Sequence, residues 1–142
     1  MKVLALGGSG GMGRFAVETC MDFDNISEVI VADINADAAI AFANSMNGKV
    51  SGIGLDVTDT DALKAQMEEV DVVINTVGPF YKYGPPILQA AIDKSCHYLD
   101  INDDWEPTLE MLSLHEKAEN NSITAILGMG GSPGLTNMLG AA

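Results

Sequence analysis

The stretch Gly7-Gly8-Ser9-Gly10-Gly11-Met12-Gly13 decides the fold of this 142-residue chain. It comes directly after residues 3–6, an apolar run that is typical of a buried strand. It leads into residues 12–22, where apolar side chains recur with helical spacing. A glycine-rich turn between a strand and a helix is typical of a dinucleotide-binding βαβ unit.

Three glycines of this turn have the spacing G-x-G-x-x-G. We expect Gly8 to permit the tight turn, Gly10 to let the backbone approach a pyrophosphate, and Gly13 to let the helix close on the strand. The unpaired N–H groups at the start of the helix would then face the phosphates, with a hydroxyl from Ser9 and a charge from Arg14 beside them. The cofactor-binding residues expected in this turn are therefore Gly8, Ser9, Gly10, Gly11, Met12, Gly13 and Arg14.

An acidic residue at the end of the second predicted strand narrows the choice of dinucleotide. Asp33 lies 20 residues after Gly13, where a carboxylate can bind both ribose hydroxyls of the adenosine. The same carboxylate would repel a 2′-phosphate, and residues 34–38 contain no Arg or Lys to accept one. The sequence therefore favours NAD over NADP as the cofactor; the simpler alternative is that Asp33 only ends the strand in a turn.

Apolar runs alternate with helical segments along the rest of the chain. Further strands are predicted at residues 28–32, 49–55, 72–76, 96–101 and 123–127. Helices are predicted at residues 37–46, from Thr60, from Pro85 and Pro86 as a first turn, and at 107–119 after Trp105 as a packing anchor. This alternation predicts an α/β Rossmann-type fold: a doubly wound parallel sheet of about six strands in three layers.

The residues that follow the third and fourth predicted strands should line the same crevice. Asp56 and Val57 would lie beside the adenine ring, although capping of the next turn is an equal alternative for Asp56. After the fourth strand, Gly78 allows the backbone to pass close to the cofactor. The residues expected to contact the cofactor there are Thr76, Val77, Gly78 and Pro79. The aromatic residues that would wall the nicotinamide pocket, unless they belong to an ordinary packed loop, are Phe80, Tyr81 and Tyr83.

Two residues of the fifth predicted strand are the candidates for catalysis. Strand alternation puts Tyr98 and Asp100 on one face, and Asp100 stands near the functional edge of the sheet. Asp100 could orient a substrate or take part in proton transfer, and a turn or capping role is the simpler alternative.

Composition excludes several other classes of function. The formal charge is −13, from 20 acidic and 7 basic residues, without a Lys/Arg cluster, so a nucleic-acid partner is not expected. Cys20 and Cys96 lack the spacing of a zinc site or a redox pair, and His97 and His115 lack partners at metal spacing. No apolar run reaches the length of a membrane span, so we expect a cytoplasmic protein without a metal site or membrane partner.

The order of motifs resembles the nucleotide-binding half of the saccharopine dehydrogenase-like family. The resemblance rests on the glycine turn, Val31-Ala32-Asp33, Asn75-Thr76-Val77-Gly78-Pro79-Phe80, His97-Tyr98-Leu99-Asp100 and Ser132-Pro133-Gly134-Leu135. It implies a nicotinamide-dependent oxidoreductase acting at a C–N bond of an amino acid or polyamine. Where several members of the family have Asp before the Pro-Gly pair, this chain has Ser132, so that residue's role does not carry over.

The resemblance also bears on domain organisation. Residues 1–127 would form the dinucleotide-binding Rossmann domain, and residues 128–142 a loop and helix start leading toward a substrate domain that is absent from this chain. The uncovered apolar residues Leu135, Met138 and Leu139 agree with that division. The expected partners are an amino-acid-like small molecule and that C-terminal domain, and the sequence leaves a homo-oligomer open.

Three other classes compete with this interpretation. A non-catalytic NAD-sensing regulatory domain would have a similar length but lacks the proline-rich loop at residues 79–86. Short-chain dehydrogenases share Gly7-x-x-Gly10-x-x-Gly13, but their Tyr-x-x-x-Lys pair is missing here. A methyltransferase binding S-adenosylmethionine fits less well, because the glycine spacing and Asp33 suit a pyrophosphate and an adenosine ribose.

Overall fold

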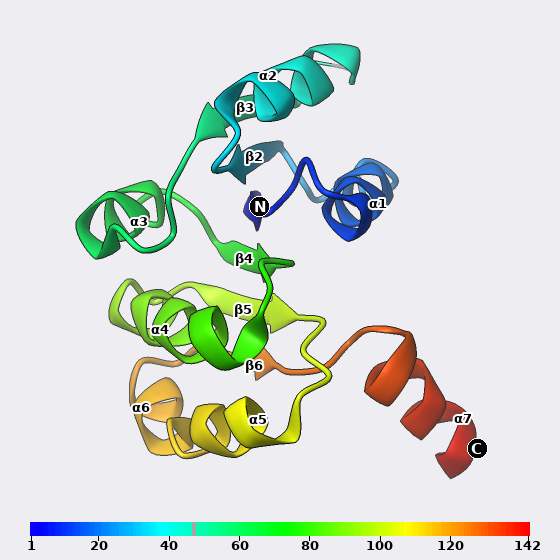
Figure 1. The fold of residues 1–142 in the computed structure, drawn as a ribbon, viewed down its shortest axis with the longest axis vertical. Helices are drawn as coiled ribbons and strands as arrows, with labels where there is room; N and C mark the ends of the chain where they lie inside the picture. The colour runs from blue at the N-terminus through cyan, green and yellow to red at the C-terminus, as the bar shows by residue number, and fades with distance from the viewer. Residues whose placement is uncertain (47) are drawn as a thin grey trace.

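The computed structural model describes residues 1–46 and 48–142 and contains one six-stranded sheet (Figure 1). All neighbouring strands are parallel, in the order β3-β2-β1-β4-β5-β6. The strands are β1 (Lys2–Leu6), β2 (Glu28–Asp33), β3 (Val50–Gly54), β4 (Val72–Asn75), β5 (His97–Asp100) and β6 (Ala125–Ile126). The helices are α1 (Gly11–Cys20), α2 (Ala36–Ser45), α3 (Thr60–Gln66), α4 (Phe80–Asp93), α5 (Trp105–Leu112), α6 (His115–Asn120) and, after the turn η1 (Gly131–Leu135), α7 (Thr136–Ala141). The predicted doubly wound Rossmann-type fold is confirmed.

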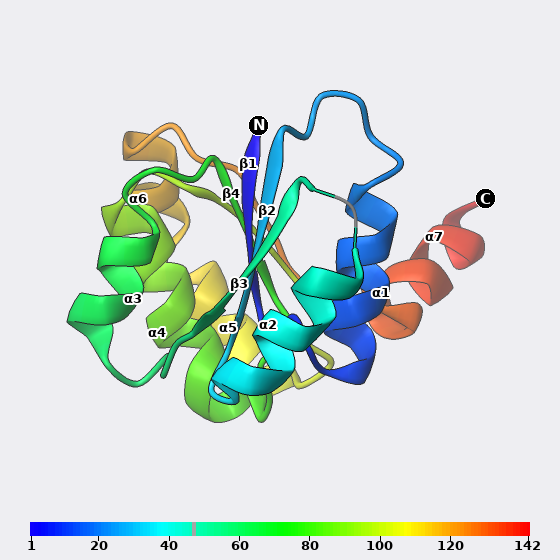
Figure 2. The same cartoon turned by 90° about the horizontal axis from the view of Figure 1, so that it is seen from above.

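Helices cover both faces of the sheet, as Figure 2 shows. Helices α1 and α2 lie on one face, and α3 to α6 lie on the other. Side chains of β1 alternate between the two apolar cores: Val3 and Ala5 pack with the α1 and α2 face, whereas Leu4 and Leu6 pack with the opposite face. A strand buried on both faces needs a continuous apolar sequence, which explains the apolar run of β1 from Val3 to Leu6.

The strand at one edge of the sheet is less well covered than β1. No residue of β3 is fully buried, and β3 pairs only with β2 among the described strands. Helix α2 lies directly on β3 at Gly52, where a Cβ atom would overlap the backbone carbonyl of Ala39. The missing side chain of Gly52 therefore lets α2 and β3 approach as one closely packed unit.

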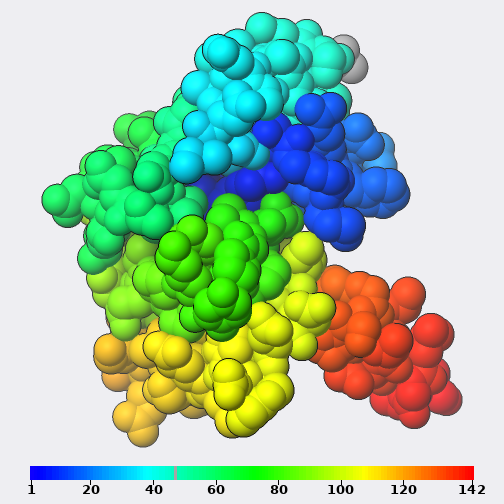
Figure 3. Space-filling view, viewed as in Figure 1, coloured from blue at the N-terminus to red at the C-terminus, as the bar shows by residue number. Residues whose placement is uncertain are grey.

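The C-terminal segment projects from the body of the domain (Figure 3). Leu135, Met138 and Leu139 are 56, 62 and 69% exposed, and the further domain expected to cover them stays a prediction. Along the described part of the chain, no helix has both the length and the apolar character needed to cross a membrane.

Three local predictions were wrong. Helix α4 begins at Phe80, because the amides of Lys82 and Tyr83 already donate to the carbonyl of Pro79 at 3.1 and 3.2 Å, so Pro85 and Pro86 lie inside the helix. The single helix predicted at 107–119 is divided into α5 and α6, and Ser113, whose hydroxyl bonds the Glu110 carbonyl at 2.6 Å, ends α5. Trp105 is 70% exposed and anchors nothing.

A surface ion pair joins α3 to α4 and gives a test of pH dependence. Lys64 Nζ lies 2.6 Å from Asp93 Oδ2 and lowers the pKa of that carboxyl below its ordinary value of 3.8. A depressed carboxylate pKa stabilises the fold above the unfolded-state pKa, and this contribution is lost as the pH falls through the folded pKa. Because both side chains are about a third exposed, we expect Asp93→Asn to lower the unfolding free energy by at most about 1 kcal/mol at neutral pH.

Urea unfolding of wild type and Asp93→Asn at about pH 7 and about pH 3 checks this expectation. The difference between the two proteins should shrink toward zero at the lower pH. A difference that grew on acidification would contradict the assigned direction of the pKa.

Candidate functional site

A cleft of about 310 Å³ opens at the carboxyl ends of the central strands. It lies where the strand order reverses between β1 and β4, the position at which open α/β sheets bind ligands. Its lining residues come from the ends of β1 to β4 and from α4. They are Gly7, Gly10, Ala32, Asp33, Ile34, Leu55, Asp56, Val57, Thr58, Thr76, Val77, Gly78 and Tyr83.

The glycine turn forms one wall of the cleft and has the geometry that its spacing predicts. Gly7 has φ +68°, and the amides of Gly7 and Gly8 donate to the carbonyl of Ala32 at 2.9 and 3.3 Å. A Cβ atom on Gly13 would overlap the Gly7 carbonyl oxygen and lie 2.6 Å from Gly8 Cα. Helix α1 can therefore begin against the turn only because residue 13 has no side chain.

The start of α1 suits an anionic ligand. Its N-cap, Gly10, makes no side-chain hydrogen bond, and its first turn contains no acidic residue. The leading N–H groups of an α-helix have no partner within the helix and carry a partial positive charge. The turn thus presents backbone donors of the kind that hold a phosphate group.

Asp33 closes β2 and lies beside the glycine turn. Ser9 Oγ donates to Asp33 Oδ2 at 2.6 Å, and the Asn35 amide donates to Oδ1 at 3.2 Å. Ser9 therefore contacts the carboxylate directly, a contact that the sequence analysis did not anticipate. The positive charge of Arg14 is held at the rim, with Nε 2.7 Å from the Ser9 carbonyl and the guanidinium 4.8 Å from the centre of the Phe42 ring.

Asp56 lies in the cleft and also shapes the turn after β3. The Thr58 hydroxyl and amide donate to Asp56 Oδ1 at 2.7 and 2.9 Å and lower the pKa of this carboxyl. The next helix is capped instead by Asp59, whose side chain accepts from the Ala62 amide at 3.0 Å. Asp56 thus lines the cleft and fixes the turn after β3 without capping α3, and its place beside an adenine ring stays a prediction.

The loop after β4 forms the opposite wall. Thr76 Oγ1 donates to the carbonyl of Leu6 at 2.8 Å, which ties this loop to the end of β1. The Val77 amide donates to Asn75 Oδ1 at 2.9 Å, and Gly78 lines the cleft with open space where a Cβ atom would stand. The Thr76 hydrogen bond thereby holds the loop after β4 close to the end of β1, beside the cavity.

Not every predicted residue lines the hollow itself. Tyr83 does, whereas Phe80 is buried in the core and Tyr81 is 67% exposed, so two of the three aromatic residues do not wall the cleft. The other predicted residues outside the cavity lining are Gly8, Ser9, Gly11, Met12, Gly13, Arg14 and Pro79. Lining residues that the sequence analysis missed are Gly7, Ala32, Ile34, Leu55 and Thr58, each next to or two positions from a residue that it named.

The two candidate catalytic residues lie behind the cleft wall. Tyr98 and Asp100 are on one face of β5, as predicted, with the Tyr98 hydroxyl donating to Asp100 Oδ2 at 3.0 Å. Both are essentially fully buried, and burial is the main cause that raises the pKa of each side chain. Their partner Asn75, whose amide nitrogen donates to the Tyr98 hydroxyl at 2.9 Å, was not predicted from the sequence.

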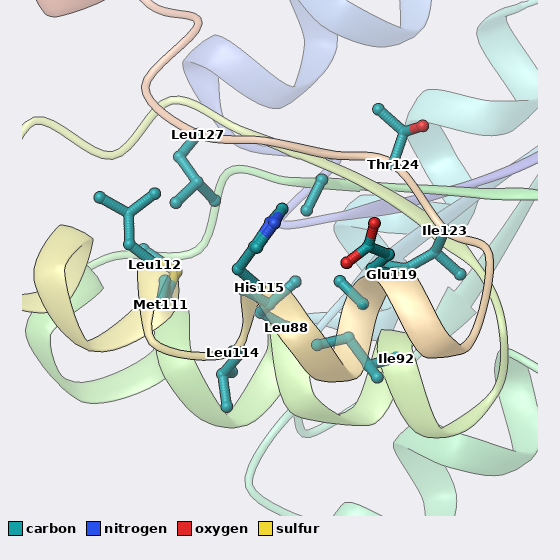
Figure 4. Close-up of a pocket in the computed structure, with 12 residues that line it drawn as sticks. Leu88, Ile92, Met111, Leu112, Leu114, His115, Glu119, Ile123, Thr124 and Leu127 are labelled. Atoms are coloured by element: carbon teal, nitrogen blue, oxygen red, sulfur yellow. The ribbon is translucent and has the colours of Figure 1, made fainter.

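A second hollow of about 320 Å³ lies at the β6 edge, between α4 and α6 (Figure 4). Its lining is mostly aliphatic, and the side chains of His115 and Glu119 are the ionisable groups beside it. It shares no residue with the cleft at the glycine turn. Because the cleft, unlike this mostly aliphatic hollow, brings several polar groups together at the carboxyl ends of the strands, the cleft is the candidate ligand site.

Comparison with known proteins finds a matching family model and relatives that are named oxidoreductases. The family model described as "Saccharopine dehydrogenase NADP binding domain" matches residues 3–126. A probable mitochondrial saccharopine dehydrogenase-like oxidoreductase of Arabidopsis thaliana is 27% identical over 130 residues, covering 82% of this chain and 29% of that protein. The human saccharopine dehydrogenase-like oxidoreductase is 31% identical over 84 residues, covering 58% of this chain and 19% of that protein.

Solved structures of other proteins are also similar to this chain. Apo saccharopine dehydrogenase (L-Glu forming) from Saccharomyces cerevisiae matches with a TM-score of 0.83 and 27% identity, over 98% of this chain and 29% of that one. Citrobacter triphenylmethane reductase complexed with NADP(H) matches with a TM-score of 0.68 and 16% identity, over 89% and 48%. The second likeness concerns the fold alone. The chain spans less than a third of the saccharopine dehydrogenase relatives that it matches.

Proposed function

Because this chain belongs to the family of the saccharopine dehydrogenase NADP binding domain, we propose that its cleft binds a nicotinamide dinucleotide. The observation that carries the proposal is the pairing of two polar features of the cleft. One is the glycine turn, which presents unpaired N–H groups at the start of α1, and the other is the Asp33 carboxylate beside this turn. The first suits a pyrophosphate and the second suits ribose hydroxyls, so one dinucleotide can satisfy both.

We propose NAD rather than NADP as the preferred cofactor, although the family description names NADP. A 2′-phosphate would bring negative charge close to Asp33, which costs about 4 kcal/mol per charge pair at about 4 Å and an effective dielectric of about 20. None of the described residues that line the cleft is Arg or Lys. The cation of the turn, Arg14, is already held by the Ser9 carbonyl and the Phe42 ring.

The family assignment also supports a reaction class. We propose that the domain serves an oxidoreductase that transfers a hydride at a C–N bond of an amino acid or polyamine. The relatives are more than three times as long as the matched segment, so the substrate-binding groups are proposed to lie in a further domain that follows residues 128–142. The bound cofactor would supply the hydride acceptor, and the residues of this chain would hold and orient it.

Titration calorimetry of the chain with NAD⁺, NADP⁺ and S-adenosylmethionine tests the cofactor assignment. We expect NAD⁺ to bind at least about tenfold more tightly than NADP⁺, a difference of about 1.4 kcal/mol in binding free energy. We expect no binding of S-adenosylmethionine. Tighter binding of NADP⁺ would overturn the preference. Binding of S-adenosylmethionine without either dinucleotide would overturn the proposed function and favour the methyltransferase class.

A further inference from the structure

A chain of buried hydrogen bonds runs from the loop after β4, which lines the cleft, into the interior of the sheet. Asn75 ends β4 and pairs in register with Asp100 of β5, two residues beyond Tyr98. The Asn75 amide nitrogen donates to the Tyr98 hydroxyl at 2.9 Å, and this hydroxyl donates to Asp100 Oδ2 at 3.0 Å. All three residues are at most 1% exposed, so water does not replace any of these partners.

The two ends of this chain hold different loops. At one end, Asn75 Oδ1 accepts from the Val77 amide at 2.9 Å, within the loop that forms the wall of the cleft. At the other end, Asp100 Oδ1 accepts from the amides of Asn102 at 3.1 Å and Gly128 at 2.7 Å. The loops that follow β4, β5 and β6 are therefore joined through buried side chains at one edge of the sheet.

The direction of the hydrogen bonds determines how the Asn75 amide is turned. A carboxylate accepts only, and Asp100 receives three donors: two backbone N–H groups and the Tyr98 hydroxyl. Since Tyr98 donates toward Asp100, its oxygen lone pairs face the NH₂ group of Asn75. The carbonyl of that amide must then point the other way, toward the Val77 N–H group. A flipped amide would place two donors against each other at Val77.

We propose that Tyr98 is a positioning residue of the dinucleotide site, acting through Asn75 on the cleft wall formed by Thr76, Val77 and Gly78. The inference rests on the proposed function, because the ligand held by that wall is the dinucleotide. Tyr98 itself touches no part of the cleft; its hydroxyl keeps the Asn75 amide in the one orientation that fixes the Val77 backbone. This gives a role to a side chain that is too deeply buried to meet a substrate.

The substitution Tyr98→Phe tests the proposal, because it removes one oxygen and keeps the ring that fills the core. We expect NAD⁺ affinity to fall about tenfold, the effect of losing one oriented hydrogen bond at the site. Amide hydrogen exchange, measured without ligand, should become faster at Val77. A role confined to stability would lower the melting temperature but leave the affinity of the remaining folded protein and the relative protection of Val77 unchanged.

Thr108→Val is the matched control. It removes the Thr108 hydroxyl, which accepts from Asn102 Nδ2 and donates to the Asp104 carbonyl, each at 2.7 Å, and which takes no part in the hydrogen bonds of Asn75 or Tyr98. We expect this variant to lose some stability but to keep the wild-type NAD⁺ affinity and the exchange rate at Val77. If Tyr98→Phe does not fold, Asn75→Ala takes its place, because it removes the amide through which Tyr98 is proposed to act.

The outcomes separate this inference from the proposed function. If wild type binds no dinucleotide, the proposed function fails, and the exchange rate at Val77 still reports whether Tyr98 orders the loop. If wild type binds NAD⁺ and Tyr98→Phe binds it equally with Val77 equally protected, the positioning role is overturned while the function stands. In the double variant Tyr98→Phe, Asn75→Ala, we expect no further loss of affinity beyond that of Asn75→Ala.

Discussion

Replacing Gly13 by alanine is expected to abolish measurable dinucleotide binding and to destabilise the domain by about 3 kcal/mol. The new Cβ would overlap the Gly7 carbonyl oxygen and lie 2.6 Å from Gly8 Cα, and both obstacles are backbone atoms that no rotamer change can move. Helix α1 would have to shift away from β1, and the donors at its N-terminus would leave their place beside the cleft. Calorimetric titration with NAD⁺ and urea unfolding measure the two effects.

Two glycines provide the controls for this experiment. Gly11 begins the same helix and has open space where a Cβ would stand, so Gly11→Ala should keep the wild-type unfolding free energy to within about 0.5 kcal/mol. Gly140, far along α7, also has open space, so Gly140→Ala should leave both stability and NAD⁺ affinity unchanged. A Gly13→Ala variant that resembled these two would show that the turn and the helix can separate without loss.

The second large effect is expected at Asp33. Removing the carboxylate in Asp33→Ala should weaken NAD⁺ binding by about 10- to 100-fold, the equivalent of losing hydrogen bonds to a charged group. NADP⁺ binding should strengthen in the same variant, because the repulsion of a 2′-phosphate disappears. The ratio of the two affinities should therefore move toward NADP⁺ by more than either affinity changes alone, and paired calorimetric titrations measure it.

Two control variants distinguish the effect of the Asp33 carboxylate on this ratio from the effects of nearby groups. Asp37→Ala removes the same charge from an exposed position in the first turn of α2, outside the cleft lining, and should leave the NAD⁺ to NADP⁺ ratio unchanged. Ser9→Ala removes the donor at 2.6 Å but keeps the Asp33 charge, so discrimination against NADP⁺ should persist. An unaltered ratio in Asp33→Ala would show that Asp33 is only the turn residue at the end of β2.

The features that could be predicted from the sequence are those that depend only on residues near them in the chain. The glycine turn follows from steric demands within seven residues, and Asp33 follows from the nearly constant length of a βαβ unit. Strand alternation likewise placed Tyr98 and Asp100 on one face, which the structure confirms. Each of these inferences needs only the chain near the residue in question.

The parts that were missed depend on register and on distant packing. The Tyr98 hydroxyl meets Asn75 only because β4 pairs with β5 in one register, across 23 residues of sequence. Ser9 meets Asp33 across 24 residues, through two loops that no local pattern relates. Trp105 is apolar and stands at the start of a helix, but which side of α5 faces the core is decided by α4, against which Met111 rather than Trp105 is buried.

The thin cover of β3 has a consequence for the motions of the domain. An edge strand with no fully buried residue opens at lower free energy than a central strand, and α2 is so closely seated on it at Gly52 that the two would leave together. Such a local unfolding would carry away Leu55 and Asp56, while the glycine turn stayed in place. A ligand that contacts both the glycine turn and Asp56 binds only the closed state, so the population of this partly open state would fall in proportion to cofactor occupancy.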